Sequence, residues 1–167
     1  MFSFTIWIDG DSCPLLVKNF VIDYAKPKEL KVTFVANREI SIPKNSARFK
    51  MIVCEKKDGA ADDYIYENIQ ENDVVITRDI PFAARLVEKK IFVMNDRGTV
   101  FTKDNIKERL SERNFNLNLA QIGLVNNSKK TYSQKELKKF ADTFNRHVSQ
   151  LMVNETYSKK NESTKQD

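Results

Sequence analysis

The 167-residue chain is poor in the residues on which several common chemistries depend. It has two cysteines, Cys13 and Cys54, and a single histidine, His147. Neither a CxxC motif nor a Cys/His cluster is present, so the sequence offers no zinc site of the usual kind, and one histidine excludes a pair of histidines as acid and base. Two isolated cysteines are typical of a reducing compartment, and we expect a cytoplasmic location.

Glycine and long apolar runs are also scarce. Only four glycines occur, and no GxGxxG or GxxxxGK[ST] motif is among them, which argues against the usual dinucleotide and P-loop sites. No apolar run approaches the roughly 18 residues that cross a membrane, and the first residues lack a basic segment, so we expect no membrane partner and no signal peptide. The apolar content of 41% suits one domain with its own core.

Short β-branched runs alternate with helical patterns along the chain. The sequence predicts strands at 4–9, 31–36, 49–54, 73–77 and 91–94, and helices at 14–25, 60–69, 80–88, 103–113 and 133–152. Such alternation is typical of a mostly parallel sheet covered by helices, so we predict an α/β, three-layer Rossmann-like fold over residues 1–153. Residues 154–167 carry almost nothing apolar, and we expect a disordered polar tail there.

Charge is distributed unevenly around the net value of +5. Residues 26–57 carry nine Lys or Arg against three acids, whereas residues 58–80 carry seven acids against one Arg. A basic surface around an acidic centre suits an enzyme that acts on a phosphate polymer, although lysine-rich surfaces also serve solubility alone. On the first interpretation we expect the acidic centre to be bordered by Arg97 and some of Lys44, Arg48, Lys56 and Lys57.

Carboxylates follow two of the predicted strands. Asp9 and Asp11 lie at the end of the strand 4–9, Asp79 follows the strand 73–77, and Asp62 falls in the first turn of the helix 60–69. Because parallel strands end at one edge of the sheet, we expect these side chains to converge there. Carboxylates so close together repel one another, and an all-oxygen site favours Mg²⁺ or Mn²⁺.

Each of these acids has a simpler explanation as a helix cap. Asp11 or Ser12 would cap the helix that begins at Pro14, and Asp79 would cap the helix that opens at Pro81. Asp62 and its neighbour Asp63 would only favour a helix N-terminus. Asp9 lies on the strand itself, where no cap is needed, so the joint occurrence favours a metal site.

Polar side chains at the ends of other strands complete the predicted edge. Asn37 follows the strand 31–36, Thr77 and Arg78 precede Asp79, and the turn 95–98 contains Arg97. An arginine there is suited to binding a phosphate through two N–H groups. The alternative is that the segment 95–98 is an ordinary turn and Arg97 an ion-pair partner.

Five motifs carry a family resemblance: IWIDGDSCP (6–14), FVAN (34–37), DGAADDYI (58–65), ITRDIP (76–81) and NDRGTVFTKDNI (95–106). In this order and spacing they resemble the bacterial YaiI/YqxD family over about residues 4–150. Members of that family resemble PIN-type nuclease domains, in which acidic residues at the carboxyl edge of a Rossmann-like sheet hold Mg²⁺ or Mn²⁺ for RNA cleavage. The resemblance therefore implies a PIN-like domain over residues 1–153 and RNA as the partner.

The same resemblance implies roles for individual residues. It implies a metal-dependent ribonuclease in which the catalytic residues are Asp9, Asp62 and Asp79, the metal ligands are these three with Asp11, and the substrate is bound by Asn37, Thr77 and Arg97. One position departs from the family pattern. Gly59 stands where relatives often have an acid, and Asp58 comes one place earlier.

Two other functional classes remain open from the sequence. An Asp-x-Asp after an apolar strand also resembles haloacid-dehalogenase-like phosphatases, with Asp9 as nucleophile and Asp11 as acid and base. In that family the later acidic pair follows the Thr and Lys motifs, whereas Asp62 and Asp63 precede Thr77. The second class is a non-catalytic nucleic-acid-binding or regulatory module that keeps the acids without turnover. The sequence does not indicate an oligomeric state.

Overall fold

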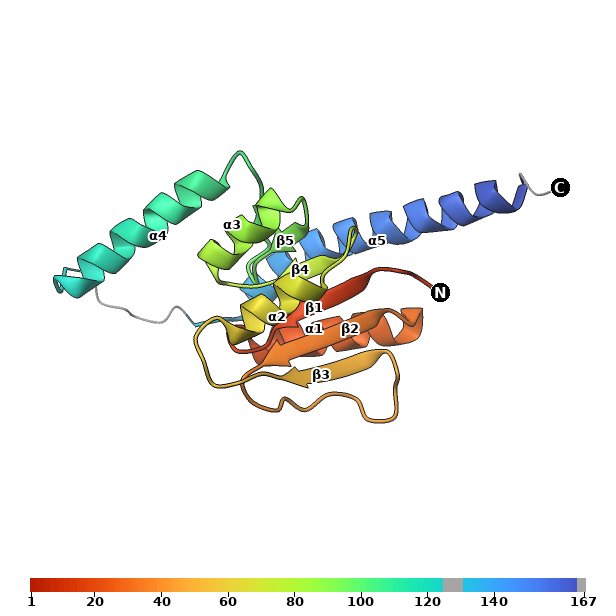
Figure 1. The fold of residues 1–167 in the computed structure, drawn as a ribbon, viewed down its shortest axis with the longest axis horizontal. Helices are drawn as coiled ribbons and strands as arrows, with labels where there is room; N and C mark the ends of the chain where they lie inside the picture. Colours follow the sequence, from red (N-terminus) through yellow and green to blue (C-terminus); the bar gives the residue numbers. More distant parts are fainter. Residues whose placement is uncertain (125–130, 165–167) are drawn as a thin grey trace.

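The computed structural model describes residues 1–124 and 131–164, which fold around one six-stranded sheet (Figure 1). The strands are ordered β3-β2-β1-β4-β5-β6, and all neighbours are parallel except β5 and β6. Their bounds are β1 Thr5–Asp9, β2 Lys31–Ala36, β3 Phe49–Val53, β4 Val74–Ile76, β5 Phe92–Met94 and β6 Val100–Phe101. The first and fourth strands are neighbours in this order and pair with Ile8 opposite Ile76.

Helices cover both faces of this sheet. Their bounds are α1 Leu15–Ala25, α2 Ala60–Asn68, α3 Ile80–Glu88, α4 Ile106–Gln121 and α5 Gln134–Thr164, with a 3₁₀ turn at Lys26–Lys28. Side chains alternate along a strand, so Ile6 and Ile8 pack with α1 and α5 on one face, whereas Trp7 packs with α2 and α3 on the other. The predicted α/β, three-layer Rossmann-like fold is therefore confirmed.

The sequence patterns missed the strand β6, which is only two residues long and antiparallel to β5. The turn between these strands depends on Gly98, whose φ of 82° favours glycine. A Cβ atom at this position would lie 2.4 Å from the carbonyl oxygen of Lys139 in α5. The hairpin is thus fixed by close approach to a distant helix, which local periodicity does not reveal.

The expectation of a disordered tail from residue 154 is corrected by the structure, in which α5 continues to Thr164; residues 165–167 lie outside the described part of the chain. The end of α5 buries few apolar side chains, and polar contacts with the first residues of the chain hold it in place. The Glu155 carboxylate accepts a hydrogen bond from the backbone N–H of Ser3 at 2.8 Å and pairs with Lys159 at 2.8 Å. Lys159 also donates to the carbonyl of Met1. Within residues 1–124 and 131–164, no helix combines the length and apolarity that crossing a bilayer requires.

Candidate active site at the carboxyl edge of the sheet

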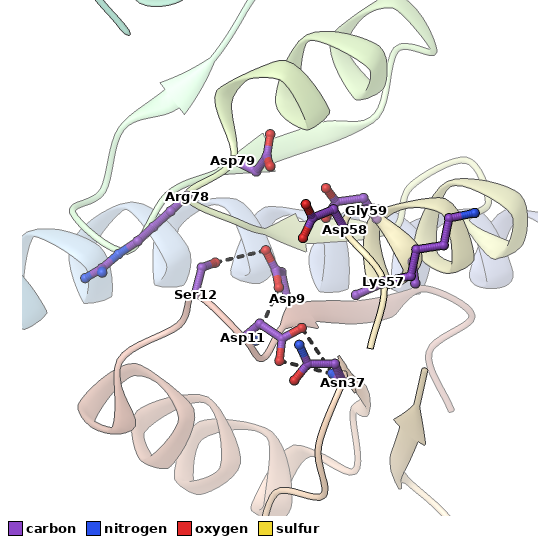
Figure 2. Close-up of a pocket in the computed structure, with 12 residues that line it drawn as sticks. Asp9, Asp11, Ser12, Asn37, Lys57, Asp58, Gly59, Arg78 and Asp79 are labelled. Carbon is purple, nitrogen blue, oxygen red and sulfur yellow. Dashed lines mark hydrogen bonds between the residues drawn. The ribbon is translucent and has the colours of Figure 1, made fainter. Parts of the chain in front are cut away.

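An open pocket of about 380 Å³ lies at the carboxyl edge of the sheet, where β1 and β4 are neighbours (Figure 2). The predicted acids Asp9, Asp11, Asp62 and Asp79 all line it, and so does Asn37. Additional lining residues that the sequence did not single out as ligands are Ser12, Lys57, Asp58 and Arg78. The topology thus brings together side chains from the ends of β1, β2 and β4 and from the start of α2.

Asp9 forms the buried base of this pocket, with only 5% of its surface exposed. One carboxylate oxygen accepts hydrogen bonds from the hydroxyls of Ser12 at 2.9 Å and Thr77 at 3.0 Å. Burial raises the pKa of Asp9, while these hydrogen bonds act in the opposite direction. Asp9 is therefore held in one orientation by the residues around it.

Thr77 lies beneath the pocket rather than on its surface, because it is 1% exposed. Its hydroxyl donates to Asp9 and accepts from the backbone N–H of Asp79 at 3.0 Å. The predicted role of Thr77 in contacting a substrate is thus corrected: the residue connects two carboxylates from inside the fold.

Asp79 caps the N-terminus of α3, as one interpretation of the sequence predicted, and it also lines the pocket. Its Oδ1 atom accepts a hydrogen bond from the backbone N–H of Phe82 at 2.9 Å, which makes it the N-cap of α3. Capping fixes where this carboxylate lies relative to the end of β4. The two interpretations that the sequence left open for Asp79 are therefore compatible.

Capping does not explain the other acids. The N-cap of α1 is Pro14, without a side-chain cap, and the carboxylate of Asp11 instead accepts from the backbone N–H of Asn37 at 3.0 Å. The expectation that Asp11 or Ser12 caps α1 is therefore wrong, because both side chains turn toward the ends of the strands. Asp63 points away from the pocket and pairs with Arg85 at 3.0 Å.

Asp62 shows the strongest electrostatic perturbation among these carboxylates. It lies in the first turn of α2, whose N-cap is Gly59 with a φ of 78° and no side-chain cap. Partial burial, followed by the negative charges of Asp9 and Asp79, raises the pKa of Asp62 to about 7. Near neutral pH, a substantial fraction of Asp62 is thus protonated unless positive charge enters the pocket.

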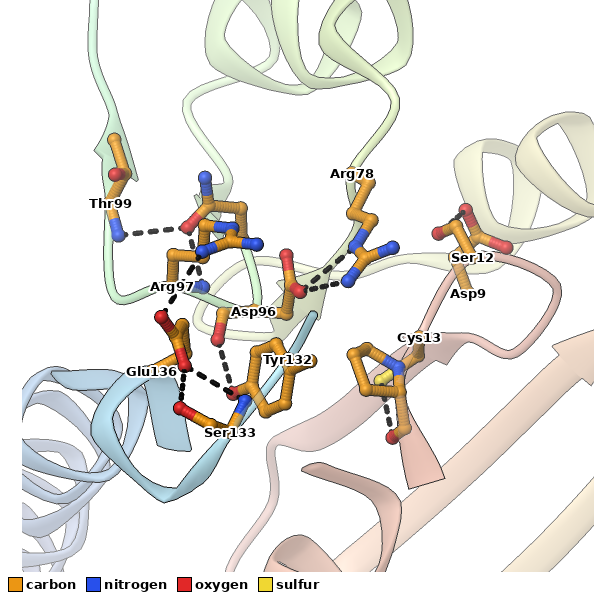
Figure 3. Close-up of polar contacts among 12 residues, drawn as sticks. Asp9, Ser12, Cys13, Arg78, Asp96, Arg97, Thr99, Tyr132, Ser133 and Glu136 are labelled. Carbon is orange, nitrogen blue, oxygen red and sulfur yellow. Dashed lines mark hydrogen bonds and ion pairs between the residues drawn. The ribbon is translucent and has the colours of Figure 1, made fainter. Parts of the chain in front are cut away.

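Arg78, rather than Arg97, is the arginine that borders the pocket (Figure 3). Arg78 donates two hydrogen bonds to the buried Asp96 carboxylate, from Nε at 2.8 Å and from a terminal nitrogen at 2.5 Å. Hydrogen bonding to Asp96 raises the pKa of Arg78. The backbone carbonyl of Asp96 accepts from the Tyr132 hydroxyl at 2.6 Å. Arg78 is therefore fixed at the margin of the pocket by the turn after β5.

The prediction that Arg97 lies at the acidic edge is corrected, because its guanidinium turns toward α5. There it lies 3.7 Å from the Glu136 carboxylate and over the ring of Tyr132. The ion-pair alternative for Arg97 is the one found. Arg97 lies in the turn between β5 and β6, outside any strand, so no periodic pattern in the sequence indicated where its side chain points.

The predicted basic border is present only in part. Lys57 lines the pocket, but Lys44 and Arg48 line a different cavity at the amino edge of the sheet. These two residues come before β3, whereas Lys57 comes after it, and a strand separates the residues at its two ends by its full length. Lys57 therefore meets the expectation that some of these cations border the acids, whereas Lys44 and Arg48 do not.

The side chains of the pocket offer oxygen atoms, the ligands that Mg²⁺ and Mn²⁺ prefer. In the described part of the chain, no three His, Cys, Asp or Glu side chains form a ready-made metal site. Asp9, Asp11 and Asp79 are engaged by the hydrogen bonds given above. A hydrated Mg²⁺ needs no complete protein cage, because it keeps several waters and binds through one or two carboxylates. The all-oxygen donor set and the crowded negative charge fit such an ion.

A family model described as "Uncharacterized BCR, YaiI/YqxD family" matches residues 7–150. A UPF0178 protein of Treponema denticola is 45% identical over 137 residues, which cover 82% of this chain and 86% of that protein. A UPF0178 protein of Syntrophobacter fumaroxidans is 38% identical over 86% of this chain and 94% of its own length, and one of Myxococcus xanthus is 35% identical over 90% and 97%. No solved structure matches.

Proposed function

We propose that this chain, which belongs to the YaiI/YqxD family, is a divalent-metal-dependent phosphodiesterase that cleaves RNA at the acidic pocket. The observation that carries the proposal is the crowding of Asp9, Asp62 and Asp79, which contributes to raising the pKa of Asp62 to about 7. Unneutralised carboxylates destabilise a fold, and such clusters are typical of functional sites. A divalent cation relieves this repulsion and accounts for the cluster.

Each side chain has a role that follows from its position. Asp62 and Asp79 would hold Mg²⁺ or Mn²⁺, directly or through its waters, with Asp11 at the margin. Asp9 would contribute from the base of the pocket, where Ser12 and Thr77 fix its orientation. A bound ion would supply an activated water and polarise the phosphodiester.

Arg78 takes the role that the sequence suggested for Arg97. It borders the pocket beside Ser12, and its guanidinium is held by Asp96 (Figures 2 and 3). A guanidinium has five N–H donors, so Arg78 keeps donors for the non-bridging oxygens of a phosphate after binding Asp96. Lys57 adds a second positive charge across the pocket.

The rival phosphatase chemistry is less well supported by this geometry. Asp9 would have to attack phosphorus, yet it is 5% exposed and one of its oxygens accepts two hydroxyl hydrogen bonds. The non-catalytic module uses the same acids and the same cation, and differs only in lacking turnover. The proposed ribonuclease is therefore best distinguished from this module by an assay of cleavage.

The test is incubation of the purified protein with single-stranded RNA and DNA in Mg²⁺, in Mn²⁺ or in excess chelator. Asp79→Asn keeps an oxygen that can cap α3, so the fold should survive while RNA cleavage falls by about 100-fold or more. Asp63→Asn is the matched control, because Asp63 neighbours Asp62 but faces Arg85. Its cleavage rate should stay within about twofold of the wild type, in line with the small effects of surface changes.

Three results would contradict the proposal. Cleavage that persists in excess chelator would exclude the metal-dependent reaction. Equal losses in Asp79→Asn and Asp63→Asn would show that the pocket was wrongly chosen. Metal-dependent RNA binding without any cleavage would favour the non-catalytic module.

A further inference from the structure

The amino edge of the sheet carries a concentration of positive charge, at the opposite end of the strands from the acidic pocket. Two cavities of about 230 and 280 Å³ are found there, and Arg48 lines both. We define the amino-edge basic surface by the cations that line them: Lys26, Lys31, Lys44, Arg48 and Lys50. The only acid among the lining residues is Glu29.

Part of this surface is a face of the sheet that helices leave uncovered. The second cavity is lined by side chains of β1, β2 and β3, which point to the side of α2 and α3. The α2 residues Ala61 and Ile65 pack with Trp7 and Val35, farther along the strands toward the carboxyl edge. The beginnings of the strands therefore remain open on this face.

The strand register places like charges side by side there. Thr33 pairs with Lys50, and Val32 pairs with Phe49, so Lys31 and Arg48 precede that pair together. The backbone N–H of Val32 donates to the carbonyl of Arg48 at 2.8 Å. Like charges at neighbouring cross-strand positions destabilise a sheet. An anion bound between these cations would offset their repulsion.

The protein itself neutralises little of this charge. Glu29 lies 4.0 Å from the Arg48 guanidinium, and its side chain is 75% exposed, so the pair is weak. The Asp73 carboxylate accepts from the backbone N–H groups of Thr5 and Gln70 and from the Trp7 indole. Glu155 binds Ser3, whose carbonyl accepts from Lys31 at 3.2 Å. Among the residues that the structure describes, the four lysines of the surface form no ion pair.

Arg48 is the fixed element of the surface. One terminal nitrogen donates to the carbonyl of Glu29 at 3.0 Å, and the backbone N–H donates to the Ser46 hydroxyl at 3.3 Å. Its side chain is 24% exposed. A held guanidinium with unused N–H donors loses little entropy when it binds a phosphate.

We propose that the amino-edge basic surface binds the phosphate backbone of single-stranded RNA, as a site separate from the acidic pocket. Its cations extend across two cavities, which suits successive phosphates rather than one. The strands separate it from the pocket by about 15–20 Å, so one RNA strand can contact both. The choice of RNA over DNA rests on the proposed function, whereas the binding site itself does not.

The test measures binding without cleavage. Anisotropy of a labelled single-stranded RNA is recorded in excess chelator over a range of salt concentrations. The double variant Lys44→Glu/Lys50→Glu reverses two charges of the surface, and Lys107→Glu/Lys138→Glu makes the same change on α4 and α5. We expect the first to weaken binding about 10-fold or more at low salt and to reduce the salt slope by about 1.4, and the control to change affinity by less than about threefold.

Several outcomes would overturn the proposal. Equal weakening in both double variants would mean that net charge alone attracts RNA. Displacement of RNA by millimolar inorganic phosphate would indicate a site for one phosphate group. Vesicles of phosphatidylserine that bind the wild type but not Lys44→Glu/Lys50→Glu, with RNA affinity unchanged, would indicate a membrane surface.

RNA binding at the amino-edge basic surface and cleavage at the acidic pocket are measured separately, so either proposal can fail without the other. If the acidic pocket has no nuclease activity, RNA affinity should still depend on Lys44 and Lys50. If the surface binds no RNA, Asp79→Asn still tests cleavage at the pocket. RNA affinity in excess chelator that falls as far in Asp79→Asn as in Lys44→Glu/Lys50→Glu would contradict their separation.

Discussion

Replacing Asp62 by asparagine should stabilise the protein at alkaline pH and abolish its function. Asparagine keeps the shape of the side chain but removes a charge that burial disfavours and that Asp9 and Asp79 repel. The pKa of Asp62 rises from an ordinary value of 3.8 to about 7, which corresponds to about 4 kcal/mol of destabilisation when the group is ionised. Because Asp62 is only partly buried, solvent screening reduces the expected gain to about 2 kcal/mol.

The raised pKa of Asp62 determines how the stability gained in Asp62→Asn changes with pH. A carboxyl with a raised pKa binds its proton more tightly in the folded state, so the stability of the wild type falls as pH rises from about 4 to about 7. The advantage of Asp62→Asn should therefore be near zero at pH 4, grow through this window and level off above it. Addition of Mg²⁺ at pH 8 should stabilise the wild type more than the variant, because only the wild type keeps all its carboxylates.

Urea unfolding followed by tryptophan fluorescence is the suitable assay. Trp7 is the sole tryptophan, is buried, and donates its indole N–H to Asp73, so its emission reports on the core. Asp63→Asn is the control, because Asp63 is 61% exposed and pairs with Arg85 at the surface; its free energy of unfolding should change by less than about 0.5 kcal/mol. A stabilisation of Asp62→Asn that is absent at pH 8, or equal at all pH values, would refute the electrostatic reasoning.

Two further predictions concern contacts that fix the site and the last helix. Asp96→Asn should lower the free energy of unfolding by about 1–3 kcal/mol and raise the KM for RNA, because Arg78 loses its charged partner. Tyr132→Phe removes the hydrogen bond to the Asp96 carbonyl, so it should lower the free energy of unfolding by about 1 kcal/mol and leave KM unchanged. Denaturation curves and steady-state cleavage check both variants, and an unchanged KM in Asp96→Asn would mean that Arg78 does not contact the substrate. Glu155→Ala should increase hydrogen exchange in the last turns of α5, since Ser3 and Lys159 lose their shared partner, and exchange that stays at the wild-type rate there would disprove that anchoring.

Much of the fold could be predicted from the sequence because its signals are local. Apolar β-branched runs at the segments that become β1, β2 and β4 indicate buried parallel strands, and their alternation with helices indicates the layers. The same logic predicted that Asp9, Asp62 and Asp79 share one edge, since residues at strand ends follow the direction of the strand. The short strand β6 and the length of α5 escaped prediction, because Gly98 and Glu155 act through contacts with distant segments.

The sequence by itself determined which residue types reach the edges of the sheet, and the tertiary structure decided what each of them does there. Thr77 and Arg78 are neighbours in the chain, but one lies beneath the carboxylates and the other pairs with Asp96. Lys57 and Arg48 belong to one basic stretch, but β3 separates them and places them at opposite edges. The pKa of Asp62 depends first on burial and then on charges that are far apart in sequence and close in space, and only packing sets both.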